Sequence, residues 1–216
     1  MAVSLRRRNP FAGSRDLHVR RGTPDDAALV AAFLRREGAR RQFFPAYDER
    51  DLTSPTGLLR GLPIEDVFLA FEGDALRGTA AAWDQRSFRQ SRITGYGAAL
   101  GRTRPLYNAC ARVRGLPELP KPGATLDHFL VALVAIEGDS VSVFSALLAE
   151  IFDAMRPSGF SFLSIGLHER DPLSEAVRGV RRFEFGTRVY VAHWESARRE
   201  LESLDDRVPY LELGAL

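Results

Sequence analysis

The feature that most constrains the fold is an unbroken apolar run, FLVALVAI, at residues 129–136. Eight apolar residues with no polar alternation indicate a strand that is covered on both faces. Such strands are typical of parallel or mixed sheets flanked by helices. We therefore expect this strand to lie at the centre of a sheet.

The residues after this run have a different period. Residues 137–140 end the strand, and apolar residues then recur at the i, i+3, i+4, i+7 spacing of an amphipathic helix. These are Phe144, Leu147, Leu148, Ile151 and Phe152. Pro157 and Gly159 end the helix, and residues 160–167 indicate a second short strand. The pattern predicts a right-handed βαβ unit whose helix begins beyond the carboxyl end of the first strand, where ligands of open α/β sheets bind.

Segments on both sides supply further elements. Residues 67–72 and 76–83 are separated by Gly73 and Asp74, which tolerate the backbone of a tight turn, so they indicate a hairpin. The sequence TPDD at residues 23–26 is a strong helix start, with a hydroxyl cap, a proline and two acids. Further strands are expected at 17–21, 86–90, 93–96, 183–194 and 208–213, and helices at 23–36, 105–114, 171–178 and 195–204.

Composition bounds the class of protein. The 216 residues are 45% hydrophobic and 27% charged, as in a globular domain, and we expect one domain at 17–216 after a flexible, Arg-rich leader at 1–16. One cysteine excludes an internal disulfide, and no apolar run approaches the roughly 18 residues of a membrane span. The start has no signal-peptide core, so we expect a cytoplasmic protein that does not associate with membranes.

Charge gives no sign of a nucleic-acid partner. The formal net charge is only +2, and the arginines are scattered along the chain without a recognition motif. The histidines have no metal-ligand spacing, so no metal site is expected. The sequence leaves the oligomeric state open, a homodimer included.

The segment EGDALRGTAAAW at 72–83, together with the order of the expected elements, resembles the GNAT superfamily of N-acyltransferases over roughly residues 17–213. The resemblance implies an α+β fold with a mixed, mostly antiparallel sheet, helices on both faces and a splayed central parallel strand pair. It also implies acetyl-CoA or another acyl-CoA as co-substrate, with its pyrophosphate on the free N–H groups at the helix start and its pantetheine arm in the splay. The acyl group would pass to an amine or hydroxyl of a small-molecule or peptide acceptor.

The residues that this resemblance assigns to acyl-CoA lie at the start of the helix. They are Ile136, Gly138, Ser140, Val141, Ser142 and Val143. The family pattern is Gln or Arg, two residues of any kind, Gly, one residue of any kind, and Gly or Ala, followed by a pair of leucines. When that pair is aligned on Leu147 and Leu148, the pattern falls on residues 139–144. Of these six residues, only Val143 agrees with the pattern. Asp139 is expected at the helix N-cap, with its carboxylate in the place of a phosphate, so we predict weak acetyl-CoA binding.

Three residues are candidates for acid–base chemistry. His168 and Glu169 follow the second predicted strand, where His168 could take a proton from an acceptor amine; the alternative is a structural cap in the segment LHERDPL. Glu137 ends the buried strand and could act as a base through water, or could simply be solvated. Residues 83–85 are candidates for acceptor contacts, with ordinary packing as the alternative, whereas His128 is expected to be a satisfied core residue.

Two classes of function therefore remain open. One is an acyltransferase that uses the βαβ geometry and His168. The other is a GNAT-like protein that has lost transfer and acts as a binding or interaction module, as the degraded glycine pattern and Asp139 favour.

Overall fold

A computed structural model describes residues 1–14, 16–54, 56–114 and 118–215. Its strands form one seven-stranded sheet in the order β2-β3-β4-β5-β6-β1-β7. Their bounds are Ala2–Ser4 (β1), His18–Arg21 (β2), Val67–Glu72 (β3), Ala75–Trp83 (β4), His128–Ile136 (β5), Phe162–Ser164 (β6) and Arg182–Phe183 (β7). All neighbours are antiparallel except β5 and β6, which form the one parallel pair. The predicted mixed, mostly antiparallel α+β fold is confirmed.

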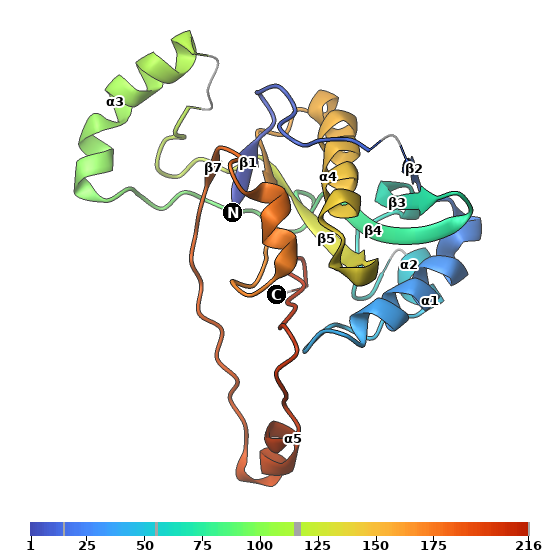
Figure 1. Cartoon of the computed structure of the whole chain (residues 1–216). Helices are drawn as coiled ribbons and strands as arrows, with labels where there is room; N and C mark the ends of the chain where they lie inside the picture. Colours follow the sequence, from blue (N-terminus) through green and yellow to red (C-terminus); the bar gives the residue numbers. More distant parts are fainter. Residues whose placement is uncertain (15, 55, 115–117, 216) are drawn as a thin grey trace.

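The helices lie around this sheet (Figure 1). The α-helices are Ala27–Gly38 (α1), Glu49–Thr53 (α2), Ala98–Val113 (α3), Val141–Met155 (α4) and Arg198–Glu202 (α5). The 3-10 helices are Pro24–Asp26 (η1), Ile64–Asp66 (η2), Glu137–Asp139 (η3), Arg156–Ser158 (η4), Pro172–Val177 (η5) and Glu195–Ala197 (η6). In the described part of the chain, none of these helices is long and apolar enough to cross a membrane.

Two hydrophobic cores lie on the two faces of the sheet, as the apolar run of β5 predicted. Phe129 of β5 and Phe144 of α4 belong to one core and are fully buried. Leu133 of β5 belongs to the other core, together with Phe33 and Leu34 of α1. The helices α4 and α1 therefore cover opposite faces of the sheet.

A β-bulge interrupts β5 at Leu133, whose φ of +50° lies in the left-handed region. Thr79 and Ala81 of β4, which are two positions apart, pair with Ala135 and Ala132 of β5, which are three positions apart. The strand β5 therefore has one extra residue here. The extra residue changes which side chains face each side of the sheet. Phe129 and Val131 before the bulge, and Val134 and Ile136 after it, consequently all pack in the core against α4.

The start of the chain corrects one expectation. We expected a flexible leader at 1–16, but Ala2–Ser4 pairs antiparallel with β6 and with β7, and all three residues are buried. The N-terminal ammonium also donates to the carbonyl of Ile165 at 2.8 Å. Ala2–Ser4 joins the sheet because β6 offers an open edge with which it can pair. Of the expected leader, Arg15 lies outside the described residues.

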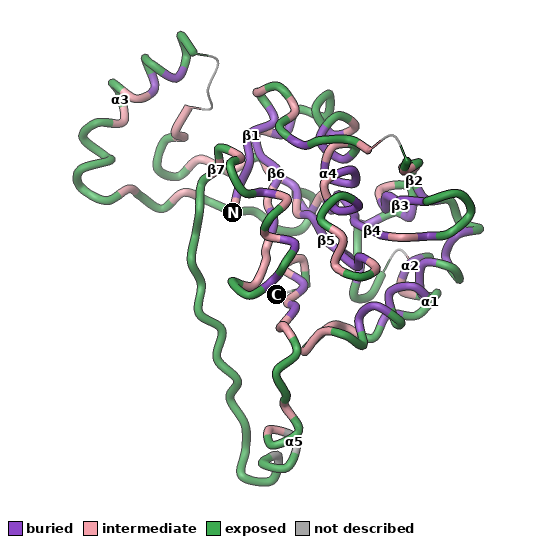
Figure 2. The backbone as a smooth tube through the Cα atoms, in the orientation of Figure 1, coloured by how far each residue is buried: buried purple, intermediate pink, exposed green. Residues whose placement is uncertain are grey.

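Four further strand predictions are wrong: 86–90, 93–96, 183–194 and 208–213. Residues 86–96 hold no sheet strand and only one isolated bridge, between Arg92 and Thr125. Of 183–194, only Phe183 lies in a strand, and the rest belongs to a mostly exposed arm at 184–207 that extends away from the sheet (Figures 1 and 2). Residues 208–213 form an irregular segment beside β5 and not a strand. The side chains of Tyr210 and Glu212, and not the backbone of this segment, bond to β5.

Candidate binding site

The parallel strands β5 and β6 separate along their length, as the prediction of a splayed pair required. Their pairing covers only His128 with Phe162, Phe129 with Leu163, and Leu130 with Ser164. The strand β5 then continues to Ile136, whereas β6 ends at Ser164. Beyond Leu130, the backbone of β5 needs other partners on this side.

The bulge sends two consecutive N–H groups toward this gap. The N–H of Leu133 donates to the Oε2 atom of Glu212 at 2.9 Å, and the N–H of Val134 donates to the hydroxyl of Tyr210 at 3.2 Å. The Tyr210 hydroxyl in turn donates to Oε2 of Glu212 at 2.7 Å. Two side chains of the tail, defined here as residues 208–214, therefore fill the space that the separated strands leave.

The environment of Glu212 is closed to water. The exposed fraction of Glu212 is 4%. Burial raises the pKa of its carboxyl group more than the hydrogen bonds from Leu133 and Tyr210 lower it. Burial and the nearby Glu212 carboxylate also raise the pKa of Tyr210 and of Tyr47. The hydroxyl of Tyr47 is buried near the carboxyl group of Glu212. The gap thus holds the carboxyl group of Glu212 beside the hydroxyls of Tyr210 and Tyr47.

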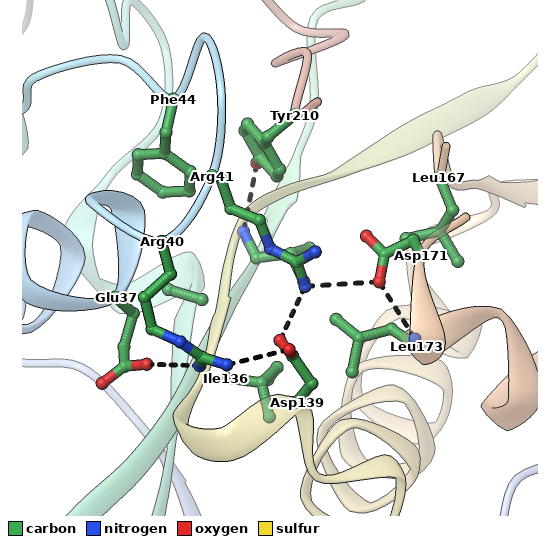
Figure 3. Close-up of a pocket in the computed structure, with 12 residues that line it drawn as sticks. Glu37, Arg40, Arg41, Phe44, Ile136, Asp139, Leu167, Asp171, Leu173 and Tyr210 are labelled. Carbon is green, nitrogen blue, oxygen red and sulfur yellow. Dashed lines mark hydrogen bonds and ion pairs between the residues drawn. The ribbon is translucent and has the colours of Figure 1, made fainter. Parts of the chain in front are cut away.

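The start of α4 is closed by ion pairs (Figure 3). Asp139 has a left-handed φ of +55° and accepts from Arg40 at 2.9 Å and from Arg41 at 2.7 Å. Arg41 also pairs with Asp171 at 3.3 Å. The cavity between these residues and Tyr210 measures about 10 Å³, enough for about one water molecule.

The N-cap assignment of Asp139 is wrong. Ser140 is the N-cap of α4, and its hydroxyl accepts from the N–H of Val143 at 3.5 Å. The carboxylate of Asp139 cannot cap the helix because its left-handed backbone turns the side chain toward the arginines of the loop after α1. The remaining expected acyl-CoA residues split: Ile136 and Val143 are buried, whereas Gly138, Val141 and Ser142 are exposed at the helix start.

The candidate acid–base residues do not form one group. The Nδ1 atom of His168 accepts from the N–H of Arg170 at 3.1 Å, so this nitrogen already has a proton donor within the turn. Glu137 pairs with Arg77 and with Arg36, and the hydrogen bond from Arg77 lowers its pKa. Glu169 is exposed. Among the described residues, no hydrogen bond or ion pair joins His168 or Glu169 to Glu137.

The segment after β6 caps the following 3-10 helix through Asp171. The N–H of Asp171 donates to the carbonyl of His168 at 2.9 Å, and the Asp171 carboxylate accepts from the N–H of Leu173 at 3.0 Å. These bonds start η5, the 3-10 helix found where a longer helix at 171–178 was expected. The imidazole of His168 therefore has a structural partner of its own.

The sequence analysis missed Arg40, Arg41, Tyr210 and Glu212 as site residues. Arg40 and Arg41 stand in a sequence, RRQFF, that is basic and aromatic, a visible signal of a functional loop. Tyr210 and Glu212 alternate as in a strand, which gave no signal that both side chains enter the sheet. No group of three or more potential metal ligands occurs in the described residues.

No protein-family model matches the chain, and no curated protein matches it. Among solved structures, the chain is similar to a point mutant of TTHA1254 from Thermus thermophilus, with 20% sequence identity and a TM-score of 0.42. The match covers 82% of this chain and 96% of that chain. A likeness at this level assigns neither a family nor a function.

Proposed function

We propose that this chain is a binding module built on a GNAT-like fold, and that it does not transfer acyl groups in this conformation. The observation that carries the proposal is the buried carboxylate of Glu212, which accepts the N–H of Leu133 in the gap between β5 and β6. In an acyltransferase of this kind, the gap would receive the pantetheine arm. Here it is filled by the chain itself.

The start of α4 supports the same proposal. A pyrophosphate there would meet the carboxylate of Asp139, and two unit charges about 4 Å apart repel by roughly 4 kcal/mol at an effective dielectric of 20. Arg40 and Arg41 do not offset this repulsion, because they also pair with Glu37 and Asp171, so that three carboxylates surround two guanidinium groups. The residues around a cavity of about 10 Å³ therefore do not fit acyl-CoA.

The candidate general bases give a further reason to propose a binding module and not an acyltransferase. A base must have a free lone pair within reach of the acceptor proton. The Nδ1 lone pair of His168 is used by the N–H of Arg170, and Glu137 is held as a carboxylate of lowered pKa by Arg77 and Arg36. Neither is arranged to take a proton from an amine.

The test is a calorimetric titration of the full chain with acetyl-CoA and longer acyl-CoAs, paired with an assay for release of the CoA thiol to a panel of amines. We expect binding no tighter than on the order of 100 μM, roughly 5 kcal/mol, and no thiol release. Micromolar affinity together with thiol release would overturn the proposal.

Acyl transfer is the second candidate, and the bulge in β5 favours it. Two consecutive N–H groups, from Leu133 and Val134, face one gap, as in sites that stabilise a developing oxyanion. The left-handed backbone of Leu133 is the kind of strain found at functional sites. This candidate requires the tail to leave, so a variant with a loosened tail would then bind acetyl-CoA more tightly than the wild type.

A further inference from the structure

The first half of the arm at 184–207 carries large apolar side chains into solvent (Figure 2). Every residue of 183–194 is exposed. The large apolar residues beyond the sheet have exposed fractions between 51% and 84%, and they are Phe185, Val189, Tyr190, Val191 and Trp194. A run of apolar side chains on this scale is rare on the surface of a monomer and marks an interaction surface.

The sequence of this stretch has the period of a half-buried strand. In FEFGTRVYV, residues 183–191, the odd-numbered positions are apolar apart from Thr187, and the even-numbered positions up to 188 hold glutamate, glycine and arginine. Among the described residues, however, no backbone–backbone hydrogen bond reaches residues 184–194. The stretch therefore has the pattern of a strand without a neighbouring strand in the described part of a single chain.

The place of this stretch in the fold makes it accessible to another molecule. It continues directly from β7, which is the outermost strand of the sheet and pairs with β1 on one side. From there the arm extends away from the sheet and its helices (Figure 1). The open edge of an exposed strand is a template for pairing with a strand of another chain.

Charge and area favour a second copy of this chain as the partner. Residues 184–194 hold one acid, Glu184, and one arginine, Arg188, so two copies of the stretch do not repel each other. A buried aromatic side chain removes about 150–250 Å² from water, so the three aromatic residues of each copy, with the valines, would bury roughly 1,000 Å² in a dimer. That area is about the minimum for a stable interface.

We propose that two copies of this chain form a dimer in which residues 184–194 of one copy pair antiparallel with the same residues of the other. A two-fold axis relates the two stretches, so each supplies the backbone partners that the other lacks. The apolar side chains of the two copies pack together, and the two sheets are joined through β7 of each copy. This dimer is independent of the proposed function, because it needs neither acyl-CoA nor the gap between β5 and β6.

The experiment is analytical ultracentrifugation of the full chain over a range of about 1–100 μM, with hydrogen exchange measured on the same samples. The wild type is compared with Val189→Asp and Tyr190→Asp, which place a carboxylate in the proposed interface. The matched control is Val113→Asp, which makes the same change at a valine of α3 that is 89% exposed. All three residues are exposed in the single chain, so the variants should fold, and thermal melts establish that they do.

We expect the wild type to sediment with twice the 24.0 kDa mass of the chain and to protect the N–H groups of residues 184–194 from exchange. Each arm variant should raise the dissociation constant of the dimer roughly thirtyfold or more, because a charge is buried among apolar groups, and should lose this protection. Val113→Asp should match the wild type. A monomeric wild type, arm variants that dimerise as tightly as the wild type, a control that dissociates as they do, or a dimer without protection at 184–194 would overturn the inference.

Discussion

The carboxylate of Glu212 accepts a hydrogen bond from the backbone N–H of Leu133, 2.9 Å away and 79 residues earlier in the chain. This contact joins the tail to the bulge of the central strand. It satisfies a buried donor that the sheet leaves unpaired, and it places the carboxyl group of Glu212 in the gap between β5 and β6. The proposed binding function depends on this contact, because it closes the gap to a pantetheine arm.

Loss of the Glu212 carboxylate should therefore lower stability. Glu212→Ala leaves the N–H of Leu133 and the hydroxyl of Tyr210 without an acceptor, at a cost of about 1–3 kcal/mol for each buried group. Chemical denaturation should show a fall of about 2–4 kcal/mol in the free energy of unfolding. A fall below about 0.5 kcal/mol, the usual range of surface changes, would mean that water replaces the carboxylate.

The pH dependence of stability should separate Glu212 from most other acids. Because its pKa in the folded state is raised above the ordinary value of 4.5, the folded protein holds the proton more tightly than the unfolded chain. Its contribution is fully present below that value and is lost as pH rises through the folded pKa. Glu212→Gln cannot titrate and should remove this loss. Parallel stability curves for the wild type and this variant from about pH 4 to 8 would contradict the assignment.

Asp26 should show the opposite sign. Its carboxylate accepts from Arg20 at 2.7 and 2.8 Å and from the backbone and hydroxyl of Thr23, and the Arg20 bonds are the main cause of its lowered pKa. Its contribution is present above the ordinary value of 3.8 and is lost as pH falls through the folded pKa. Asp26→Asn should cost about 2 kcal/mol near pH 7, with the difference shrinking in acid. The exposed neighbour variant Asp25→Asn is the control and should cost little.

The tail can be loosened at Gly214. A Cβ atom at this position would lie 2.2 Å from the ring of Trp83, which is only 1% exposed and cannot move aside easily. Gly214→Ala should cost about 1–3 kcal/mol and speed hydrogen exchange at the N–H of Leu133 and Val134. Gly186→Ala meets no atom within 4 Å and serves as the control. Unchanged exchange in Gly214→Ala would show that the tail is held independently of this contact.

Asp139 should limit anion binding at the start of α4. Asp139→Asn removes the charge that holds Arg40 and Arg41, and asparagine tolerates the left-handed backbone. Inorganic pyrophosphate should bind this variant at least about tenfold more tightly than the wild type, with a marked salt dependence. Asp153→Asn, an exposed change on the same helix, should have no effect. Equal affinities in all three proteins would show that the arginines are not available to phosphate.

The local elements could be predicted from sequence because their signals lie within a few neighbouring residues. The apolar run of β5, the helical spacing of α4 and the turn at Gly73 each specify a backbone period that burial then selects. Pairing of β5 with β6 followed, since a helix of this length returns the chain to a parallel neighbour. The expectation of Ser140 near a helix start and of a capping segment at His168 came from the same kind of local pattern.

The tertiary structure decided everything that depends on distant partners. The residues Ala2–Ser4 form a strand because β6 has an open edge, and no feature of an Arg-rich start indicates that edge. Tyr210 and Glu212 enter the gap because the bulge at Leu133 exposes two N–H groups, and a two-residue alternation gives no information about such a destination. Asp139 meets Arg40 and Arg41 only because α1 and α4 bring their ends together across the sheet. The sequence determined the periods of the elements, whereas hydrogen-bond satisfaction between remote segments determined what fills the site.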